Sequence, residues 1–431
     1  MCDFSTGLTN RILDVYRSFR QPPDIILARR GDDISVDPPL SARTEVIPLP
    51  IVGLNQEFRS QNRTPNFANR FAAISCAIGY LLYSLVLYFK MQRSSKTIRL
   101  VHAQFIFPHG LFGLLLARLS RVPLIVTAQG QDVSVQMRNS ILLRVASLIV
   151  LRRANLTIAV SKPIQRILRQ FGVSSIYLPN SVDTASIRPH RRLNNENSIL
   201  FVGTMIERKQ PLLLLRAFEI IADQVPAATL VMCGDGPLED CLRKEVEKKG
   251  LQKRVKLLSY ASEPTLMDLR SRAGIFVLPS LSEGTSLALL EAMAAGQAVI
   301  VSRNESHAAI LEHRVNGLFF EVGNAEELAK QILLVMADKE LRSRMSKSAR
   351  HLCETQFSNA IVAKQLEDLY LTALAGSTAE LEFRNDPCSD GTLADVKSRR
   401  IQIDIRRLFC DSSMFRADSL ERVYTGACAG F

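Results

Sequence analysis

Short apolar runs and helical segments alternate along most of this chain. In the N-terminal half, apolar runs predict strands at 24–27, 99–102, 123–127 and 156–160, and helices are predicted at 111–120 and 164–171. From residue 198 the pattern restarts with predicted strands SILFVG, ATLVMCG, VKLLSY, GIFVLPS and QAVIVS, each joined to the next by a helix. Since parallel strands need such crossover helices, the alternation predicts α/β architecture with parallel sheets covered on both faces.

The break between the two blocks lies at LPNSVDTASIRP, where Pro, Asn and Ser are typical of a linker. A chain of 431 residues also exceeds the usual size of one hydrophobic core. We therefore expect two Rossmann-like domains facing each other across a cleft, with a helix that returns to the first domain and a poorly structured tail. The predicted bounds are 1–184 and 185–360 for the domains, 361–375 for the helix and 376–431 for the tail.

Two features of the N-terminal half affect localisation. Residues 1–4 are too short for the strand that normally opens a Rossmann-like domain, so the first sheet is expected to lack its leading strand. The 19 residues 71–89 carry no charge, which favours a core helix over an interfacial helix or a membrane span. No signal peptide is evident, and the eight Cys form no C-x-x-C pair. These observations favour the cytoplasm and argue against a zinc or iron–sulfur site.

Positive charge is concentrated in the first half of the chain. Residues 1–190 carry 23 Lys and Arg against 10 Asp and Glu, whereas the remainder is nearly balanced. A solvated basic face and a surface that binds anionic lipid or an acidic acceptor both fit this pattern. Nucleic acid is disfavoured as a partner, because the sequence contains no recognised nucleic-acid-binding motif.

The segment VLPSLSEGTSLALLEAMAAG carries the strongest chemical signal. A strand ends at Leu278, and a helix is predicted to begin near Ser286 and to stop at Gly296. The N–H groups at the start of such a helix suit a pyrophosphate. Glu291 lies about five residues into the helix, so its carboxylate could accept hydrogen bonds from a ribose diol, while Glu283 would face the sugar.

These residues also carry a resemblance to a known family. Glu283-x7-Glu291 within PSLSEGTSLALLEAMAAG resembles the donor-site signature of the family 4 (group 1) glycosyltransferases of the GT-B fold, including bacterial polysaccharide-biosynthesis transferases. FVGTMIERKQPLLLLRAF, CGDGP, PNSVD, HAQFIFPHG and VTAQGQDV resemble further elements of that family in the same order. Within CGDGP, Pro237 is expected at the first position of a helix.

The resemblance implies a transferase that moves a sugar from a nucleotide-sugar donor to a lipid-linked or polysaccharide acceptor. Retention of configuration is implied, without a cofactor or an obligatory metal. The basic first half and the apolar segment 71–89 add that this cytoplasmic enzyme could lie peripherally on the inner face of the membrane. The implied catalytic residues are Glu283, Lys209 and Gln129. The implied donor-binding residues are Glu291, Gly203, Thr204, Arg208, Gly284, Thr285, Ser286 and Leu287.

The sequence departs from the family pattern at several positions. Gln129 replaces a usual His and cannot titrate, and Thr204 replaces a usual Arg, for which Arg208 could substitute. Glu305, Ser306 and Ala309 stand where glycines and a Glu are usual. The alternative is therefore a catalytically degenerate, nucleotide-sugar-binding partner subunit. An epimerase of the same fold is disfavoured, because the 59–182 segment contains a single acid.

Overall fold

A computed structural model gives the fold of the chain. It describes residues 98–130, 132, 133, 137, 141–187 and 197–376, together with strands β1 (Ile25–Arg29) and β2 (Thr44–Pro48) and a few single residues before position 90. The predicted features at 1–4 and 377–431, and most of the apolar segment 71–89, lie outside the described residues. Within the described part, no helix is long and apolar enough to cross a membrane.

The C-terminal half forms a six-stranded sheet in which every recorded pairing is parallel. Its order is β12-β11-β10-β7-β8-β9, so β7 and β10 are neighbours in the middle although three helices separate them in sequence. The strands are β7 (Ser198–Val202), β8 (Thr229–Cys233), β9 (Val255–Leu258), β10 (Ile275–Leu278), β11 (Ala298–Ser302) and β12 (Leu318–Phe320). The strand order reverses between β7 and β10, and such a switch point is where open α/β sheets bind ligands.

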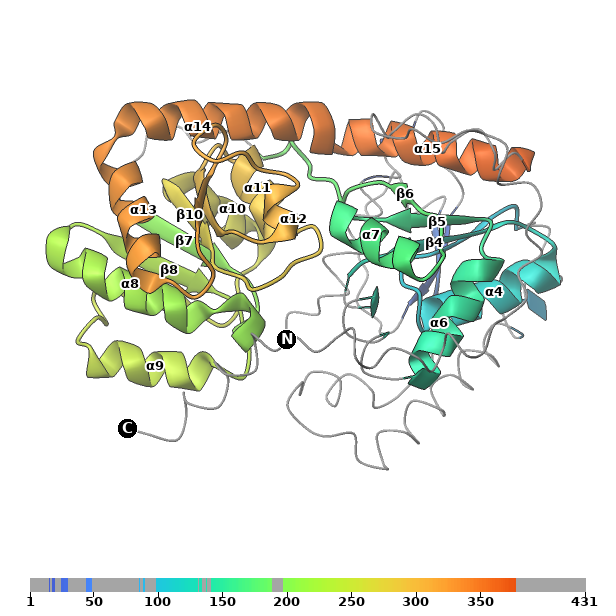
Figure 1. Cartoon of the computed structure of the whole chain (residues 1–431), viewed down its shortest axis with the longest axis horizontal. Helices are drawn as coiled ribbons and strands as arrows, with labels where there is room; N and C mark the ends of the chain where they lie inside the picture. Colours follow the sequence, from blue (N-terminus) through green and yellow to red (C-terminus); the bar gives the residue numbers. More distant parts are fainter. Residues whose placement is uncertain are drawn as a thin grey trace. The chain divides into compact units, whose positions relative to one another are not determined.

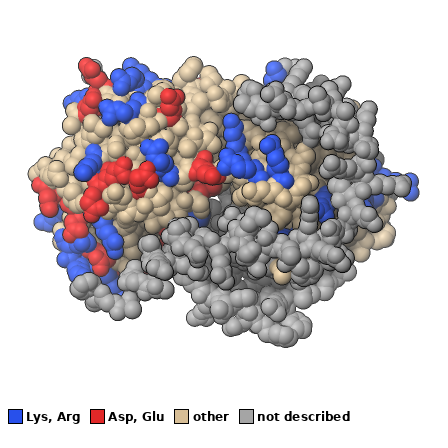
Figure 2. Space-filling model, viewed as in Figure 1, with Lys and Arg blue, Asp and Glu red and all other residues tan. Residues whose placement is uncertain are grey.

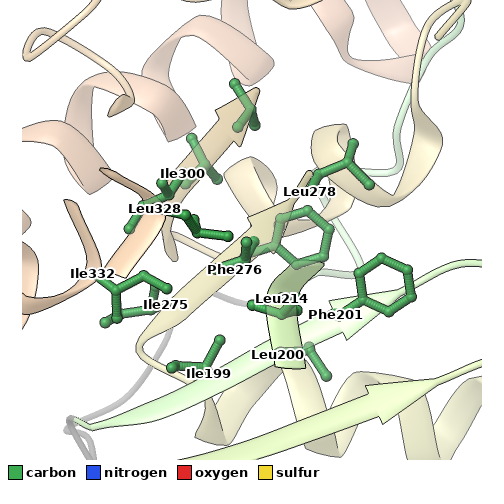
Figure 3. Packing of buried hydrophobic residues seen from close by; sticks show 14 of the residues in the cluster. Ile199, Leu200, Phe201, Leu214, Ile275, Phe276, Leu278, Ile300, Leu328 and Ile332 are labelled. Atoms are coloured by element: carbon green, nitrogen blue, oxygen red, sulfur yellow. The ribbon is translucent and has the colours of Figure 1, made fainter. Parts of the chain in front are cut away.

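Seven helices of this half follow the strands and bury the sheet (Figure 1). They are α8 (Pro211–Gln224), α9 (Glu239–Lys248), α10 (Glu263–Arg272), α11 (Leu287–Ala294), α12 (Glu305–Ala308), α13 (Ala325–Ala337) and α14 (Lys339–Leu352). Figure 3 shows Leu328 and Ile332 of α13 beside Ile275 and Ile300 of the sheet. Side chains of this kind each stabilise the fold by about 1.5–3 kcal/mol when fully buried, so this half holds a large core of its own.

The N-terminal half contributes a second parallel sheet of order β3-β4-β5-β6. Its strands are β3 (Val101–Ala103), β4 (Leu124–Ala128), β5 (Leu156–Ala159) and β6 (Ile176–Tyr177), and its helices are α4 (His109–Ser120), α6 (Ile141–Arg153) and α7 (Lys162–Gln170). Every residue of β4 and β5 is buried, because parallel strands are covered on both faces. The predicted class, α/β with two Rossmann-like parallel sheets, is confirmed.

The last described helix, α15 (Asn359–Ala375), packs with the N-terminal sheet. A π-helical turn, η3 (Cys353–Phe357), joins it to α14, and Figure 1 shows the two helices following one another along the chain. Val362, Leu366 and Leu369 of α15 share a buried cluster with Ile125 and Ile158. The chain therefore completes the core of its first half with residues of α15, which follows the whole C-terminal sheet in the sequence.

One local prediction is wrong. Pro237 is not the first residue of a helix, because α9 begins at Glu239. Gly236 has φ +152°, and Leu238 N–H donates to the Met205 carbonyl at 3.0 Å, so Pro237 lies in a turn that is fixed against a neighbouring loop. Because Pro237 and Leu238 belong to this turn, helix α9 begins two residues later than predicted.

Candidate functional site

The start of helix α11 forms the centre of the candidate site. Strand β10 ends at Leu278, and Ser286 caps α11 by accepting a hydrogen bond from the N–H of Leu289. Gly284, Thr285 and Leu287 lie around this N-terminus, at the carboxyl edge of the sheet. The N–H groups of a first helical turn carry partial positive charge, which favours an anion such as a diphosphate.

Two cations from the loop after β7 are fixed against this segment. Lys209 Nζ lies 2.6 Å from Glu283 Oε1, and Arg208 Nη1 lies 3.2 Å from Glu283 Oε2. Backbone contacts hold the loops together, because Leu281 N–H donates to the Arg208 carbonyl at 2.8 Å and Arg208 Nη1 donates to the Ser282 carbonyl at 2.7 Å. The three charged groups have a net charge of about +1 when all are ionised, so the cluster favours an anionic ligand.

Glu283 is held in its ionised form. Burial alone raises the pKa of its carboxyl group, but the neighbouring charges of Lys209 and Arg208 outweigh burial and lower the pKa to about 2. The Glu283 side chain is only 7% exposed. A carboxylate with so low a pKa is a weak base at neutral pH. Glu283 is therefore placed to orient Lys209 and Arg208 rather than to remove a proton.

Gly203 and Gly234 allow two loops of this half to approach closely. Gly234 has φ +141°, and a Cβ atom there would lie 2.1 Å from the Gly203 carbonyl oxygen. Lys209 packs beside Gly203, with its Cδ at 3.7 Å from the position of a Gly203 Cβ atom. Thr204 follows directly and is partly buried. The absence of a side chain at Gly234 thus permits the close approach of the Gly203 loop, beside which the Lys209 side chain packs.

In the N-terminal half, the loop after β4 presents Gln129. Asp132 is buried beneath this loop, and its carboxylate accepts hydrogen bonds from four backbone N–H groups at 2.8 to 3.3 Å; the donors are Ile106, Gln129, Gly130 and Val133. Burial raises the pKa of Asp132, and these hydrogen bonds partly offset the increase. Asp132 is therefore a structural residue that fixes the backbone of Gln129.

The Gln129 side chain contacts an uncharged polar side chain on each side, Asn180 on one and Gln104 on the other. Asn180 Nδ2 lies 3.5 Å from Gln129 Oε1, and Gln129 Nε2 lies 3.5 Å from Gln104 Oε1. Gln104 reaches His102, which contacts the Tyr370 hydroxyl at 2.6 Å and Thr127 at 2.8 Å. Burial lowers the pKa of His102 to about 3, so the group is neutral at physiological pH.

A cavity of about 60 Å³ lies against these amides. No Lys, Arg, Asp or Glu is among its lining residues, which also include Ser181 and Leu287. Amides and hydroxyls of this kind both donate and accept hydrogen bonds, as the hydroxyl groups of a sugar do.

Glu291 lies deeper in the C-terminal half, and its carboxylate is already paired. The guanidinium of Arg270, on α10, donates from Nη2 to Glu291 Oε2. Both side chains are only 5% exposed. This partner was not expected from the sequence, because Arg270 belongs to none of the motifs that indicate the donor site.

The structure brings together many of the residues that the sequence singles out. Glu283, Lys209 and Arg208 form one ion-paired cluster, and Gly284 packs directly on the Gln129 loop, because a Cβ atom at Gly284 would lie 2.6 Å from the Gln129 carbonyl oxygen. Thr285 is buried, and its hydroxyl donates to the Val160 carbonyl, which makes it a packing residue here. Within the described residues, no group of His, Cys, Asp and Glu is arranged to hold a metal ion.

Comparison with known proteins identifies the family. The family model for glycosyl transferases group 1 matches residues 183–352, and the model for glycosyltransferase family 4 matches residues 45–186. The chain belongs to the family 4 (group 1) glycosyltransferases. The two matched regions correspond to the two halves described above. The group 1 model covers the Lys209–Glu283 cluster, and the family 4 model covers Gln129.

Curated relatives in this family are similar over part of their length. An uncharacterized glycosyltransferase of Methanocaldococcus jannaschii is 30% identical over 181 residues, which cover 42% of this chain and 46% of the relative. An Escherichia coli UDP-Gal:alpha-D-GlcNAc-diphosphoundecaprenol alpha-1,3-galactosyltransferase is 28% identical over 208 residues, covering 45% and 53%. The chain therefore matches about half the length of these two relatives.

Solved structures establish the GT-B fold of this glycosyltransferase family member. Anabaena Alr3699/HepE, in complex with UDP and glucose, superposes with a TM-score of 0.65 at 17% identity and covers 85% of this chain and 96% of its own. Sucrose-phosphate synthase from Thermosynechococcus elongatus gives a TM-score of 0.68 at 18% identity, with 86% and 94% covered. At these identities the likeness concerns the fold alone.

Proposed function

We propose that this chain transfers a sugar from a nucleotide-sugar donor, with retention of configuration and without an obligatory metal. The observation that carries the proposal is the Lys209–Glu283–Arg208 cluster at the N-terminus of α11. In this proposal the donor diphosphate binds at that N-terminus, and Glu291, further along α11, accepts hydrogen bonds from the ribose. HepE, which shares the fold, was solved in complex with UDP and glucose, and this supports a nucleotide-sugar donor for the present chain.

The cations supply what the departing nucleotide needs. As the sugar–phosphate bond breaks, negative charge accumulates on the leaving diphosphate, and Lys209, Arg208 and the α11 N-terminus stabilise it electrostatically. Preorganised groups of this kind are effective because they need not reorient during the reaction. The positive charge that a divalent metal provides in other transferases is thus available from the chain itself.

The proposed retention is supported by the properties of Glu283 and Gln129, neither of which is suited to act as the base. Glu283 is held ionised between two cations with a pKa of about 2, and Gln129 cannot accept a proton as a base. A phosphate oxygen of the donor remains to accept the proton of the acceptor hydroxyl. That oxygen lies on the face of the sugar from which the phosphate departs, so attack from this face retains the configuration. Gln129, Gln104 and Asn180 would hold the sugar hydroxyls.

Nucleotide-sugar binding and turnover test this proposal. We expect one member of a UDP-, GDP- and ADP-sugar panel to bind and to be slowly hydrolysed, equally in EDTA and in Mg²⁺. Glu291→Ala should weaken binding by roughly tenfold or more, since hydrogen bonds to a charged group contribute about 1.5–3 kcal/mol. Glu312→Ala, a change of the same residue type outside the site, is the control. Loss of turnover in EDTA would refute metal independence.

The same assay separates a transferase from a degenerate partner subunit. Replacement of the usual His by Gln129 is the observation that favours the second function. Binding of a nucleotide-sugar with no turnover, even with diphospholipid-linked acceptors, would support the subunit and contradict catalysis. Failure of every donor in the panel to bind would refute the donor site itself.

We further propose a lipid-linked or polysaccharide acceptor at the inner membrane face. One relative's name specifies a diphosphoundecaprenol acceptor. Helix α6 exposes Ile141 and Ile149 together with Arg152 and Arg153, a combination of apolar and basic side chains that suits an anionic bilayer surface. On the face in Figure 2, acidic side chains gather among basic ones over the C-terminal half, whereas the described part of the N-terminal half is mostly uncharged and the charged side chains visible on it are mainly Lys and Arg.

Vesicle sedimentation tests the role of α6. Each basic residue near an anionic surface contributes about 1 kcal/mol, so Arg152→Glu with Arg153→Glu should reduce binding to phosphatidylglycerol vesicles by at least roughly tenfold. The charge-matched control is Arg216→Glu with Arg344→Glu, two exposed arginines of the C-terminal half. Equal binding of the α6 variant and wild type would rule out this helix as the membrane contact.

A further inference from the structure

Arg270 is a buried cation that bridges two carboxylates. Its Nη2 donates to Glu291 Oε2 on α11, and its Nη1 lies 2.9 Å from Glu263 Oε1 on its own helix. The Arg270 and Glu291 side chains are each 5% exposed, whereas Glu263 is 61% exposed. The guanidinium therefore connects the protein surface to a carboxylate in the interior.

The two contacts fix the orientation of the guanidinium. Glu263 lies in the first turn of α10 and Arg270 in the last, seven residues apart, so both side chains extend from one face of the helix. A guanidinium is planar and donates in fixed directions, and a lysine ammonium cannot reproduce this geometry. With Nη1 held by Glu263, the direction in which Nη2 meets Glu291 is determined.

This contact matters because of where Glu291 lies. The residue is about five positions from the start of α11, or roughly 7 Å along the helix axis, which is the depth expected for a ribose when a diphosphate binds at the helix start. A carboxylate can accept about four hydrogen bonds, so a carboxylate that accepts from Arg270 can also accept from a diol. A buried carboxylate without a cation would instead tend to take up a proton, and a protonated carboxyl is a poorer acceptor.

We propose that Arg270 is a positioning residue for Glu291, and that this pair makes the site select a ribonucleotide over its 2′-deoxy counterpart. This inference rests on the proposed donor site. Arg270 acts through Glu291, which touches the 2′- and 3′-hydroxyls, and Glu263 keeps Arg270 in place. The selectivity is thus determined by α10, a helix that contributes nothing to the diphosphate contacts.

The ratio of affinities for ribo- and deoxyribonucleotides is the measurement that separates positioning from stability. Calorimetry with UDP, GDP and ADP and with dUDP, dGDP and dADP should give wild type a ratio of roughly tenfold or more for the preferred base. We expect Arg270→Lys to reduce the ratio to under about threefold, as Glu291→Gln does, because each removes the aligned acceptor. Glu263→Gln, a surface change that poses little risk to folding, should give an intermediate ratio.

A matched control lies on the same helix. Arg272 pairs with Asp268 at 2.8 Å and is 71% exposed, so Arg272→Lys changes the same residue type two positions away without touching Glu291. It should preserve the wild-type ratio. The double variant Arg270→Met with Glu291→Gln should be no worse in this ratio than Glu291→Gln alone, because the two residues act as a unit.

The possible results have distinct meanings. If Arg270→Lys and Glu263→Gln lower the melting temperature but keep the full wild-type ratio, Arg270 is only a structural ion-pair residue and the inference is overturned. If wild type binds the ribonucleotides without preference over the deoxy forms, the inference also fails while the donor site stands. If wild type binds none of the six nucleotides, the proposed function itself fails.

Discussion

Replacing Lys209 with methionine is expected to lower the turnover of the nucleotide-sugar by about 100- to 1000-fold, the usual result of removing one preorganised group that stabilises transition-state charge. Methionine keeps the length and apolar character of the side chain but removes its charge. Lys209 is mostly buried against Glu283, and its loss leaves Arg208 as the cation that partners this carboxylate. The cluster would then have no net positive charge with which to receive a diphosphate.

Steady-state kinetics with the preferred donor measure this effect, with kcat and KM determined separately. Lys249→Met is the matched control, because Lys249 also forms a 2.6 Å ion pair, with Glu219, but is not part of the cluster. Its kinetics should match those of wild type. A loss of less than about fivefold for Lys209→Met would contradict electrostatic stabilisation by this residue.

Alanine at Gly234 is expected to destabilise the protein by about 3 kcal/mol or more, because its methyl group would overlap the neighbouring loop. The Cβ atom would lie 2.1 Å from the Gly203 carbonyl oxygen, and the backbone at Gly234 has φ +141°, where an L-residue is strained. Both loops must move apart to relieve this contact. Urea unfolding followed by circular dichroism gives the difference in the free energy of unfolding.

Gly250→Ala separates overlap from backbone strain. Gly250 also has a positive φ, +66°, but no atom lies within 4 Å of its Cβ position. We expect this variant to lose only about 1–2 kcal/mol, the typical strain of an L-residue in the left-handed region. Equal losses for the two variants would show that the close approach of the Gly203 loop is not maintained in solution.

Strands and their order of appearance were predictable because parallel sheets leave an obvious pattern. Runs such as SILFVG and GIFVLPS are almost wholly apolar, and β7 and β10 are buried as expected. Strand β6 was missed because it has only two residues, Ile176 and Tyr177, too few for any periodicity. The pairing of β7 with β10 could not be predicted from the sequence of either strand. It depends on how the intervening helices pack on the sheet, which the two strand sequences do not contain.

At the candidate site, residue types were predictable and their partners were not. Glu283 and Lys209 could be singled out from their motifs, yet 74 positions separate them, and local sequence does not indicate that they pair at 2.6 Å. Arg270 was missed for the opposite reason. An Arg on a helix usually reaches solvent, as Arg272 does, and no feature of the surrounding sequence distinguishes the buried Arg270 from it. Asp132 was visible as an isolated acid, and three of its four backbone donors lie in its own loop, but the fourth, Ile106, is 26 positions away and could not be read from the local sequence.

The return of α15 to the N-terminal sheet has a consequence for synthesis. A ribosome adds about 5–20 residues per second, so Ile125 and Ile158 emerge at least about 10 s before the Leu366 and Leu369 side chains that cover them. The six-stranded half, by contrast, draws its core from residues 182–357 and is complete before α15 exists. The C-terminal half, although it is synthesised second, can therefore fold first. The N-terminal half keeps apolar surface exposed to chaperones until α15 is released.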